Sequence, residues 1–425
     1  MNQTFSLHIK GRDRKLKLTI FNSELKQIIF MNQFDNFFQE ALSKREEEGF
    51  RRKLTPIDVA SSVQIQVQGQ KYLNFSSNDY LGLSFHPELL QKSQECVAKY
   101  GTGSAASRLI TGHTSCHQAI ETQLAQFLGT EAALVFASGW QANVAVIACL
   151  IENLPKPVYV ITDKLNHASL HYGCKAGQGK QIRFRHNDMN HLQQRLDSLK
   201  DLDGSKLIIT ETIFSMDGDQ ADLKSLRRLA DEHYAFLFLD DAHATGVLGA
   251  QGQGLAPTYA DLTMGTFSKA WGSFGAYIAG SKALCDWLVN FCSGFIHTTS
   301  LPPAVNGSIA ASLELMPLLD KERAYLKQRW QYVKQQLSLW GINTGDTVSQ
   351  IIPLIVGSAE NALEITKLLK QEKLWVMPIR PPTVPAHSSR LRLTLSAAHQ
   401  SKDIEYLLDK INILIKQKPS LWKSR

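Results

Sequence analysis

Short apolar runs separated by helical segments constrain the fold of this chain most strongly. The runs AALVFA (132–137), PVYVIT (157–162), KLIIT (206–210) and AFLFL (235–239) are rich in β-branched or aromatic residues, and they do not alternate with polar ones. Such runs are typical of strands buried on both faces of a largely parallel sheet. Between them lie segments with helical periodicity. We therefore expect an α/β fold over residues 85–315, a large domain whose mainly parallel central sheet is flanked by helices.

The segments on either side of this domain have a different character. Residues 316–425 begin with a long charged helix and continue with a strand, a second helix and two strand-like runs, 375–379 and 389–395, which predicts a smaller C-terminal α+β domain. Residues 31–84 predict a helix followed by a hairpin at SVQIQVQGQKYLNF. Residues 1–30 show no clear periodicity. They are either a genuine N-terminal extension or an upstream start before Met31, and we assign them no function.

The charge distribution argues against nucleic acid as a partner. The net charge of +7 comes from the two ends, with six Lys/Arg against two acids in residues 1–30 and six against three in 401–425. The body between them therefore carries no net charge, and it has no basic stripe with interleaved aromatic residues.

Apolar runs and cysteine spacing limit the location of the protein. No run reaches the roughly 18 apolar residues of a spanning helix, and no apolar segment follows the basic N-terminus as in a secretory signal. We therefore expect a cytoplasmic protein with no membrane partner. The six cysteines form no CxxC pair and no metal-ligand spacing, so we expect free thiols and no metal site.

Polar residues that follow the buried strands are the candidate site, because ligands of open α/β sheets bind outside the carboxyl ends of the strands. After residues 132–137, Ser138 precedes an apolar helix. Two interpretations are open. Ser138 is simply the N-cap of this helix, or the amides of Gly139 and Trp140 face a phosphate at the helix N-terminus. The glycine-rich run GTGSAASRLITG matches neither nucleotide-binding glycine motif, so it is weak support for a nucleotide.

Ionisable residues follow two further strands. His167 lies just past 157–162, where a lone histidine is more often an ordinary loop residue. Asp240 and Asp241 directly follow a wholly apolar strand, with His243 just beyond. Carboxylates in such a place require a partner, because their desolvation is costly. A divalent metal and a cationic organic cofactor are the two candidates.

The lone lysine of TMGTFSKAWGSFGAYIAG, Lys269, favours the organic cofactor. A lysine near glycines is usually a surface turn. A metal site gains nothing from an ammonium group, whereas a lysine bonded to an aldehyde cofactor is neither unpaired nor fully charged. Together with an acid for a pyridinium nitrogen, a flat histidine and a helix N-terminus for a phosphate, Lys269 indicates pyridoxal 5′-phosphate (PLP).

Residues 31–415 resemble the α-oxoamine synthases, a PLP-dependent family of fold type I. The resemblance rests on motifs that occur in the family's order: NFSSNDYLGLS, ASGWQAN, LNHASL, TETIFSMDGD, DDAHATGV, GTFSKAWG, TTSLPPA and IRPPTVPAHSSRLRLTLSAAH. Within the family, IRPPTVP is most similar to the members of biotin biosynthesis. Three positions depart from the commonest pattern without weakening a catalytic assignment: Trp140, Ala244 and Ser268.

The resemblance implies a role for each matching residue. Lys269 would bond the cofactor aldehyde, Asp240 would keep the pyridine nitrogen protonated, and His167 would stack on the ring. The remaining cofactor contacts would be His243 and Ser215 at the phenolic oxygen, and Ser138, Gly139, Trp140 and Thr266 at the phosphate, with Thr298 or Thr299 from a neighbouring subunit of a homodimer. The substrate contacts would be Arg51, Asn78, His167, Thr383 and Arg392.

The implied reaction is the decarboxylative condensation of L-alanine with a pimeloyl thioester of CoA or of acyl carrier protein. Three rival functions remain: another α-oxoamine synthase such as a glycine C-acyltransferase, a PLP aminotransferase, and a non-enzymatic binding module. For Arg392 a structural alternative also remains. In RLRLTL, Arg390 and Arg392 point to one face of a strand, and both can simply line a solvated face.

Overall fold

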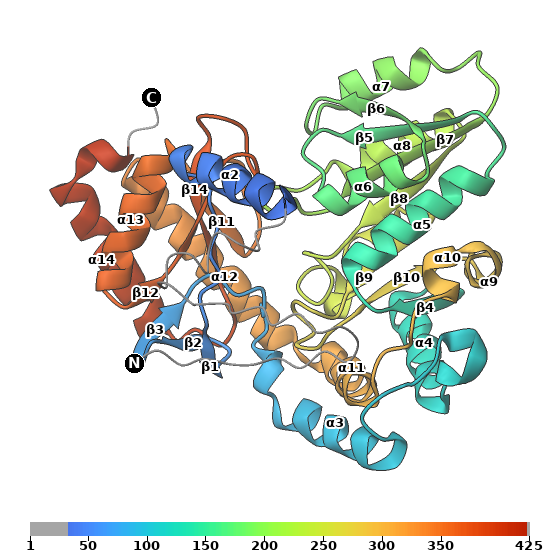
Figure 1. The fold of residues 1–425 in the computed structure, drawn as a ribbon, viewed down its shortest axis with the longest axis horizontal. Coiled ribbons are helices and arrows are strands. Elements are labelled where there is room, and N and C mark those ends of the chain that lie inside the picture. The colour runs from blue at the N-terminus through green and yellow to red at the C-terminus, as the bar shows by residue number, and fades with distance from the viewer. Residues whose placement is uncertain (1–32, 423–425) are drawn as a thin grey trace, which may run out of the picture. The chain divides into compact units, whose positions relative to one another are not determined.

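A seven-stranded sheet forms the centre of the chain. The computed structural model describes residues 33–422, and this sheet has the strand order β4-β10-β9-β8-β7-β5-β6 (Figure 1). Its strands are β4 (Ala132–Phe136), β5 (Val158–Asp163), β6 (Lys180–Phe184), β7 (Ser205–Glu211), β8 (Ala235–Asp240), β9 (Leu262–Thr266) and β10 (Ala276–Gly280). The pairs from β6 to β9 are parallel, and β10 is antiparallel to both of its neighbours. The prediction of a mainly parallel sheet is confirmed.

Helices cover both faces of this sheet, which explains the uninterrupted apolar runs. One face packs against α5 (Gly139–Asn153), α6 (Ala168–Ala176) and α9 (Lys282–Phe291). The other face packs against α4 (Ser115–Leu128), α7 (Met189–Asp197) and α8 (Leu223–Glu232). Alternate residues of a strand serve opposite faces, so Leu207 and Ile209 pack with α5 while Ile208 packs with α8.

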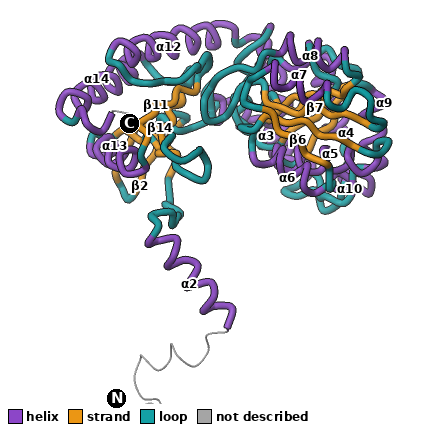
Figure 2. The backbone as a smooth tube through the Cα atoms, turned by 90° about the horizontal axis from the view of Figure 1, so that it is seen from above, coloured by secondary structure: helices purple, strands orange, loops and turns teal. Residues whose placement is uncertain are grey.

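Beyond residue 315 the chain forms a second, antiparallel sheet with the order β11-β14-β13 (Figure 2). Its strands are β11 (Ile351–Gly357), β13 (Met377–Ile379) and β14 (Ser389–Thr394), and the helices of this part are α12 (Asp320–Leu339), α13 (Ala359–Gln371) and α14 (Ser401–Gln417). The run 375–379, expected as one strand, is split. β12 (Leu374–Trp375) pairs with β3 (Gln70–Asn74) in another sheet, and only β13 joins β14, with the buried, non-strand residue Val376 between the two.

The chain separates into two compact units, Met1–Pro56 and Ile57–Arg425. In the first, α2 (Gln33–Glu47) confirms the helix expected after Met31. In the second, the expected hairpin is formed by β2 (Gln64–Val67) and β3 (Gln70–Asn74), extended by β1 (Asp58–Ser61). The remaining helices are α3 (Pro87–Tyr100), α10 (Ser293–Ile296) and α11 (Pro303–Leu315). The proposed boundaries at 84/85 and 315/316 stay predictions, and residues 1–30 lie outside the described part.

Two further features bear on the sequence expectations. All six cysteines are free thiols. Within residues 33–422, the helices are all too short or too polar to cross a membrane, and no three His, Cys, Asp or Glu side chains are grouped as metal ligands.

Candidate active site

A cavity of about 410 Å³ opens at the carboxyl ends of β5, β7, β8 and β9. This is the position expected for a ligand site in such a sheet. The cavity is lined by Asn78, Ser138, Gly139, Trp140, Asn143, His167, Ser169, Glu211, Ser215, Met216, Asp240, Ala242, His243, Met264, Thr266, Ser268, Lys269, Ile379 and Arg392. The four groups of residues that the sequence singled out, at Ser138, His167, Asp240 and Lys269, therefore line one cavity.

Lys269 projects into this cavity from the turn between β9 and β10. Its Nζ lies 2.9 Å from Nε2 of His243, and Nδ1 of His243 lies 2.7 Å from the hydroxyl of Tyr80. Burial lowers the pKa of Lys269 to about 8, although the carboxylates of Asp240 and Glu211 oppose that shift. At Gly272, with φ +64°, a Cβ would lie 2.5 Å from the carbonyl carbon of Leu83, so the turn needs glycine. The surface-turn interpretation of Lys269 is wrong.

Two buried carboxylates lie side by side at the floor of the cavity. Glu211 and Asp240 are paired in register across β7 and β8. Asp240 accepts hydrogen bonds from Nδ2 of Asn143 (2.8 Å) and from the amide of Ala242 (3.0 Å). Glu211 accepts the amide N–H of His167 at 2.6 Å. Burial, together with the charge of Asp240, raises the pKa of Glu211 well above its usual value. Asp240 is thus the carboxylate that we expect to pair with a cationic ligand.

The N-terminus of α5 forms the next wall. Ser138 caps the helix by accepting the amide of Gln141 at 3.2 Å, and this cap is compatible with a phosphate at the neighbouring amides. The cap leaves the first amides of the helix, at Gly139 and Trp140, without partners inside the helix. Gly139 and Trp140 both line the cavity, and a Cβ at Gly139 would meet only the methyl of Met264, at 3.9 Å. Thr266 and Ser268 add hydroxyl groups 2.6 Å apart. This wall suits an anion such as a phosphate.

Arg392 enters the cavity from β14 and is only 8 % exposed. Its Nε donates to the carbonyl of Ser215 (2.6 Å), and its Nη1 donates to Oδ1 of Asn78 (3.1 Å). Arg390, two residues earlier on the same face, is itself buried and forms an ion pair with the partly buried Asp217. The solvated-face alternative for the two arginines is therefore wrong.

Four residues expected at the site do not line this cavity. Thr298 binds Nε2 of Gln141 (2.9 Å), and Thr299 pairs with Ser107, both outside the cavity lining. Thr383 lies four residues after Ile379, a residue that does line the cavity, and the amide of Thr383 donates to the carbonyl of Arg380. Arg51 belongs to the first unit, where it pairs with Glu46. Their assigned roles stay predictions.

Sequence reasoning missed several lining residues. Glu211 ends a buried strand inside a quoted motif, and a glutamate there is the same signal that identified Asp240. Asn143 lies one helical turn beyond Gly139, so helical spacing could have pointed to it. Ile379 and Met216 reach the cavity only through tertiary packing, and no local pattern marks them.

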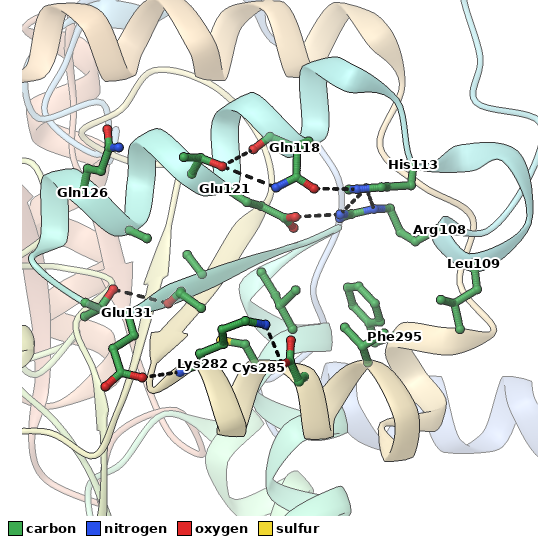
Figure 3. Close-up of a pocket in the computed structure, with 18 residues that line it drawn as sticks. Arg108, Leu109, His113, Gln118, Glu121, Gln126, Glu131, Lys282, Cys285 and Phe295 are labelled. Carbon is green, nitrogen blue, oxygen red and sulfur yellow. Dashed lines mark hydrogen bonds and ion pairs between the residues drawn. The ribbon is translucent and has the colours of Figure 1, made fainter.

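A second, larger hollow of about 530 Å³ lies beside the edge strand β4 (Figure 3). Its polar side chains bind one another. Arg108 pairs with Glu121 at 2.8 Å, Glu121 accepts the amide of Val135 at 2.7 Å, and Lys282 pairs with Asp286. These contacts bond the amide of Val135 on the free edge of β4, and they leave few polar groups of the hollow without a partner for a ligand to bind.

The aminotransferase class I and II family model matches residues 70–411. The 8-amino-7-oxononanoate synthase of Gluconacetobacter diazotrophicus is 50 % identical over 384 residues, which cover 89 % of this chain and 96 % of that protein. A serine palmitoyltransferase solved with PLP has a TM-score of 0.83 at 28 % identity, covering 91 % of this chain and 98 % of the other. The 8-amino-7-oxononanoate synthase of Francisella tularensis has a TM-score of 0.70 at 26 % identity, covering 82 % and 99 %.

Proposed function

Since the chain belongs to the 8-amino-7-oxononanoate synthase family, within aminotransferase class I and II, we propose that it condenses L-alanine with a pimeloyl thioester in biotin biosynthesis. The products are 8-amino-7-oxononanoate, CO2 and a free thiol. The observation that carries the proposal is one cavity holding the amine of Lys269 and the buried carboxylate of Asp240 beside a helix N-terminus. The choice among family members rests on the relatives at 50 % identity.

The cofactor is PLP, and the donor set of the cavity fits it. Lys269 offers an amine of lowered pKa for the aldehyde, Asp240 offers a carboxylate for the pyridine nitrogen, and the N-terminus of α5, at Gly139 and Trp140, lines the cavity where a phosphate would bind. Oδ1 of Asn143 is buried without a hydrogen-bond partner beside this carboxylate, which leaves an acceptor for a bound group. When bound, PLP supplies an electron sink that stabilises negative charge on the substrate α-carbon.

The residues of this chain hold that arrangement. Asp240 would keep a proton on the pyridine nitrogen, because its carboxylate is buried and stays fixed by Asn143. His167 would lie against the ring, and His243 and Ser215 would bind the phenolic oxygen. We propose that Ser138, Gly139, Trp140 and Thr266 hold the phosphate, with Thr298 or Thr299 of a partner subunit.

Substrate binding and proton transfer follow from the other wall. Arg392 orients the alanine carboxylate, because its planar guanidinium suits two-point binding and is anchored by Ser215 and Asn78. Lys269 exchanges the proton at the alanine α-carbon, which its lowered pKa permits near neutral pH. The α-carbon then bonds to the thioester carbonyl carbon, and the thiolate leaves and takes up a proton. The alanine carboxyl group departs as CO2, and the α-carbon takes up a proton in its place. Arg51, Asn78 and Thr383 are the further substrate contacts that we propose.

A cytoplasmic homodimer is part of the proposal. Six free thiols suit a reducing compartment. Thr298 and Thr299 lie outside the cavity lining of their own chain, which agrees with a role in a partner's site. The acyl donor is a thioester of CoA or of acyl carrier protein.

Product analysis tests the proposal. Purified holoenzyme is incubated with pimeloyl-CoA, or the acyl carrier protein thioester, and either L-alanine or glycine, and products are identified by mass spectrometry with thiol release followed in parallel. We expect 8-amino-7-oxononanoate from L-alanine at a rate well above that of the glycine product. Preferential use of glycine would assign the protein to a glycine C-acyltransferase, and conversion of the cofactor to its amine by alanine alone would assign it to the aminotransferases.

A further inference from the structure

A charged cluster outside the cavity joins two segments that form its walls. His186, in the turn between β6 and α7, lies between the carboxylates of Asp163 and Asp219. Its Nδ1 is 3.0 Å from Oδ1 of Asp163, and its Nε2 is 3.0 Å from Oδ2 of Asp219. Asp163 ends β5, and Asp219 belongs to the turn 214–219 that follows β7.

The geometry requires a doubly protonated ring. An ionised carboxylate only accepts hydrogen bonds, so an imidazole that donates to one from each nitrogen carries both protons. Burial alone lowers the pKa of His186, but the hydrogen bonds and charges of Asp163 and Asp219 outweigh it and raise that pKa to about 10. The nearby Arg185 is engaged by Asp188. His186 is thus a fixed cation at neutral pH.

The turn held by Asp219 reaches directly to Arg392. Phe214 and Asp219 close the turn with a backbone hydrogen bond of 3.0 Å, and the carbonyl of Ser215 accepts Nε of Arg392 at 2.6 Å. Gly218, with φ +70°, packs so closely that a Cβ would lie 2.2 Å from the carbonyl oxygen of Ile351. The turn is therefore wedged against β11 on one side and tied by His186 on the other.

We propose that His186 is a positioning residue for amino-acid binding: bridging Asp163 and Asp219, it fixes the turn whose Ser215 carbonyl orients the guanidinium of Arg392. This inference rests on the proposed function, in which Arg392 binds the alanine carboxylate. His186 itself does not line the cavity. Its removal should change how well the carboxylate is held, while the groups that hold the cofactor stay in place.

The test compares four holoenzyme variants with the wild type: His186→Gln, Arg392→Ala, the double variant, and His233→Gln as a control. His233 also pairs with an aspartate, Asp197 at 3.5 Å, but this pair joins the end of α8 to the end of α7. For each variant, L-alanine is titrated against the absorption spectrum of the bound cofactor, and cofactor content and melting temperature are measured separately.

We expect His186→Gln to weaken alanine binding about 10- to 100-fold with unchanged cofactor content, and His233→Gln to leave it unchanged. The double variant should bind alanine no more weakly than Arg392→Ala, since both changes act on one group. If His186→Gln does not fold, Asp219→Asn, which keeps the side-chain shape but removes one charge, takes its place.

The outcomes separate the two claims. Loss of alanine binding in Arg392→Ala but not in His186→Gln would overturn the positioning role and leave the proposed function intact. Additive losses in the double variant would also overturn it, because they would indicate a general structural effect. No loss in Arg392→Ala would overturn both the carboxylate role of Arg392 and the inference built on it.

Discussion

The two hollows beside the seven-stranded sheet differ in size and in chemistry, and the smaller one is the proposed active site. The hollow beside β4 measures about 530 Å³ and the cavity at Lys269 about 410 Å³. In the larger hollow, Arg108 and Glu121 form an ion pair, and Glu121 also accepts the amide of Val135 on the edge strand β4. In the smaller, Asp240 and Glu211 lie side by side, and burial lowers the pKa of Lys269.

The difference shows what marks a site in this fold. Buried charge that is already paired offers a ligand little, although removing one partner of the pair is strongly destabilising. Buried charge whose partner is incomplete is destabilising until a ligand supplies the missing group, so it indicates chemistry. We therefore expect substitutions in the smaller cavity to change the reaction and substitutions in the larger hollow to change only stability.

The largest effect on the reaction is expected from Asp240→Asn. An amide cannot stabilise a protonated pyridine nitrogen by charge, so the rate of alanine α-proton exchange should fall by about 10²–10³. Exchange is measured by deuterium uptake from D2O, with circular dichroism as the check on folding. Near wild-type exchange in a folded variant would remove the pyridinium role and, with it, the contrast between the hollows.

A smaller effect is expected from pH. An amine must be neutral to attack an aldehyde, and Lys269 has a pKa of about 8 against an ordinary value of 10.5. Near pH 8 its neutral fraction should therefore be roughly 100-fold above that of an exposed lysine. The rate at which cofactor-free protein recombines with PLP should rise through pH 8 and level off above it. A rate that keeps rising towards pH 10.5 would show that burial does not tune this amine.

The smallest effect on the reaction, with a large effect on stability, is expected from Glu121→Ala. The change leaves Arg108 buried without its partner and the amide of Val135 without an acceptor, so unfolding should become easier by about 3–5 kcal/mol. Urea denaturation measures the loss, and kcat/KM of the folded enzyme should change little. A fall in kcat/KM comparable to that of Asp240→Asn would mean that the larger hollow takes part in the reaction.

The sequence predicted those parts of the molecule that local patterns encode. The apolar runs predicted the sheet, and Ser138 and Asp240, which come just after two of them, do meet the separately identified Lys269 at its carboxyl edge. Two kinds of feature could not be predicted. The split between β12 and β13 depends on which sheet each end of one apolar run joins. The burial of Arg390 depends on Asp217, which lies 173 residues away in the sequence.

The central claim is that the amine of Lys269 bonds the cofactor, and chemical trapping tests it most directly. Borohydride reduction of the holoenzyme fixes the bond between cofactor and lysine, and peptide mapping by mass spectrometry locates the label. Lys269→Ala serves as the control and should carry no label while still folding. We predict one label per chain, on the peptide containing residues 265–272. A label on any other lysine, or an equal label in Lys269→Ala, would contradict the account.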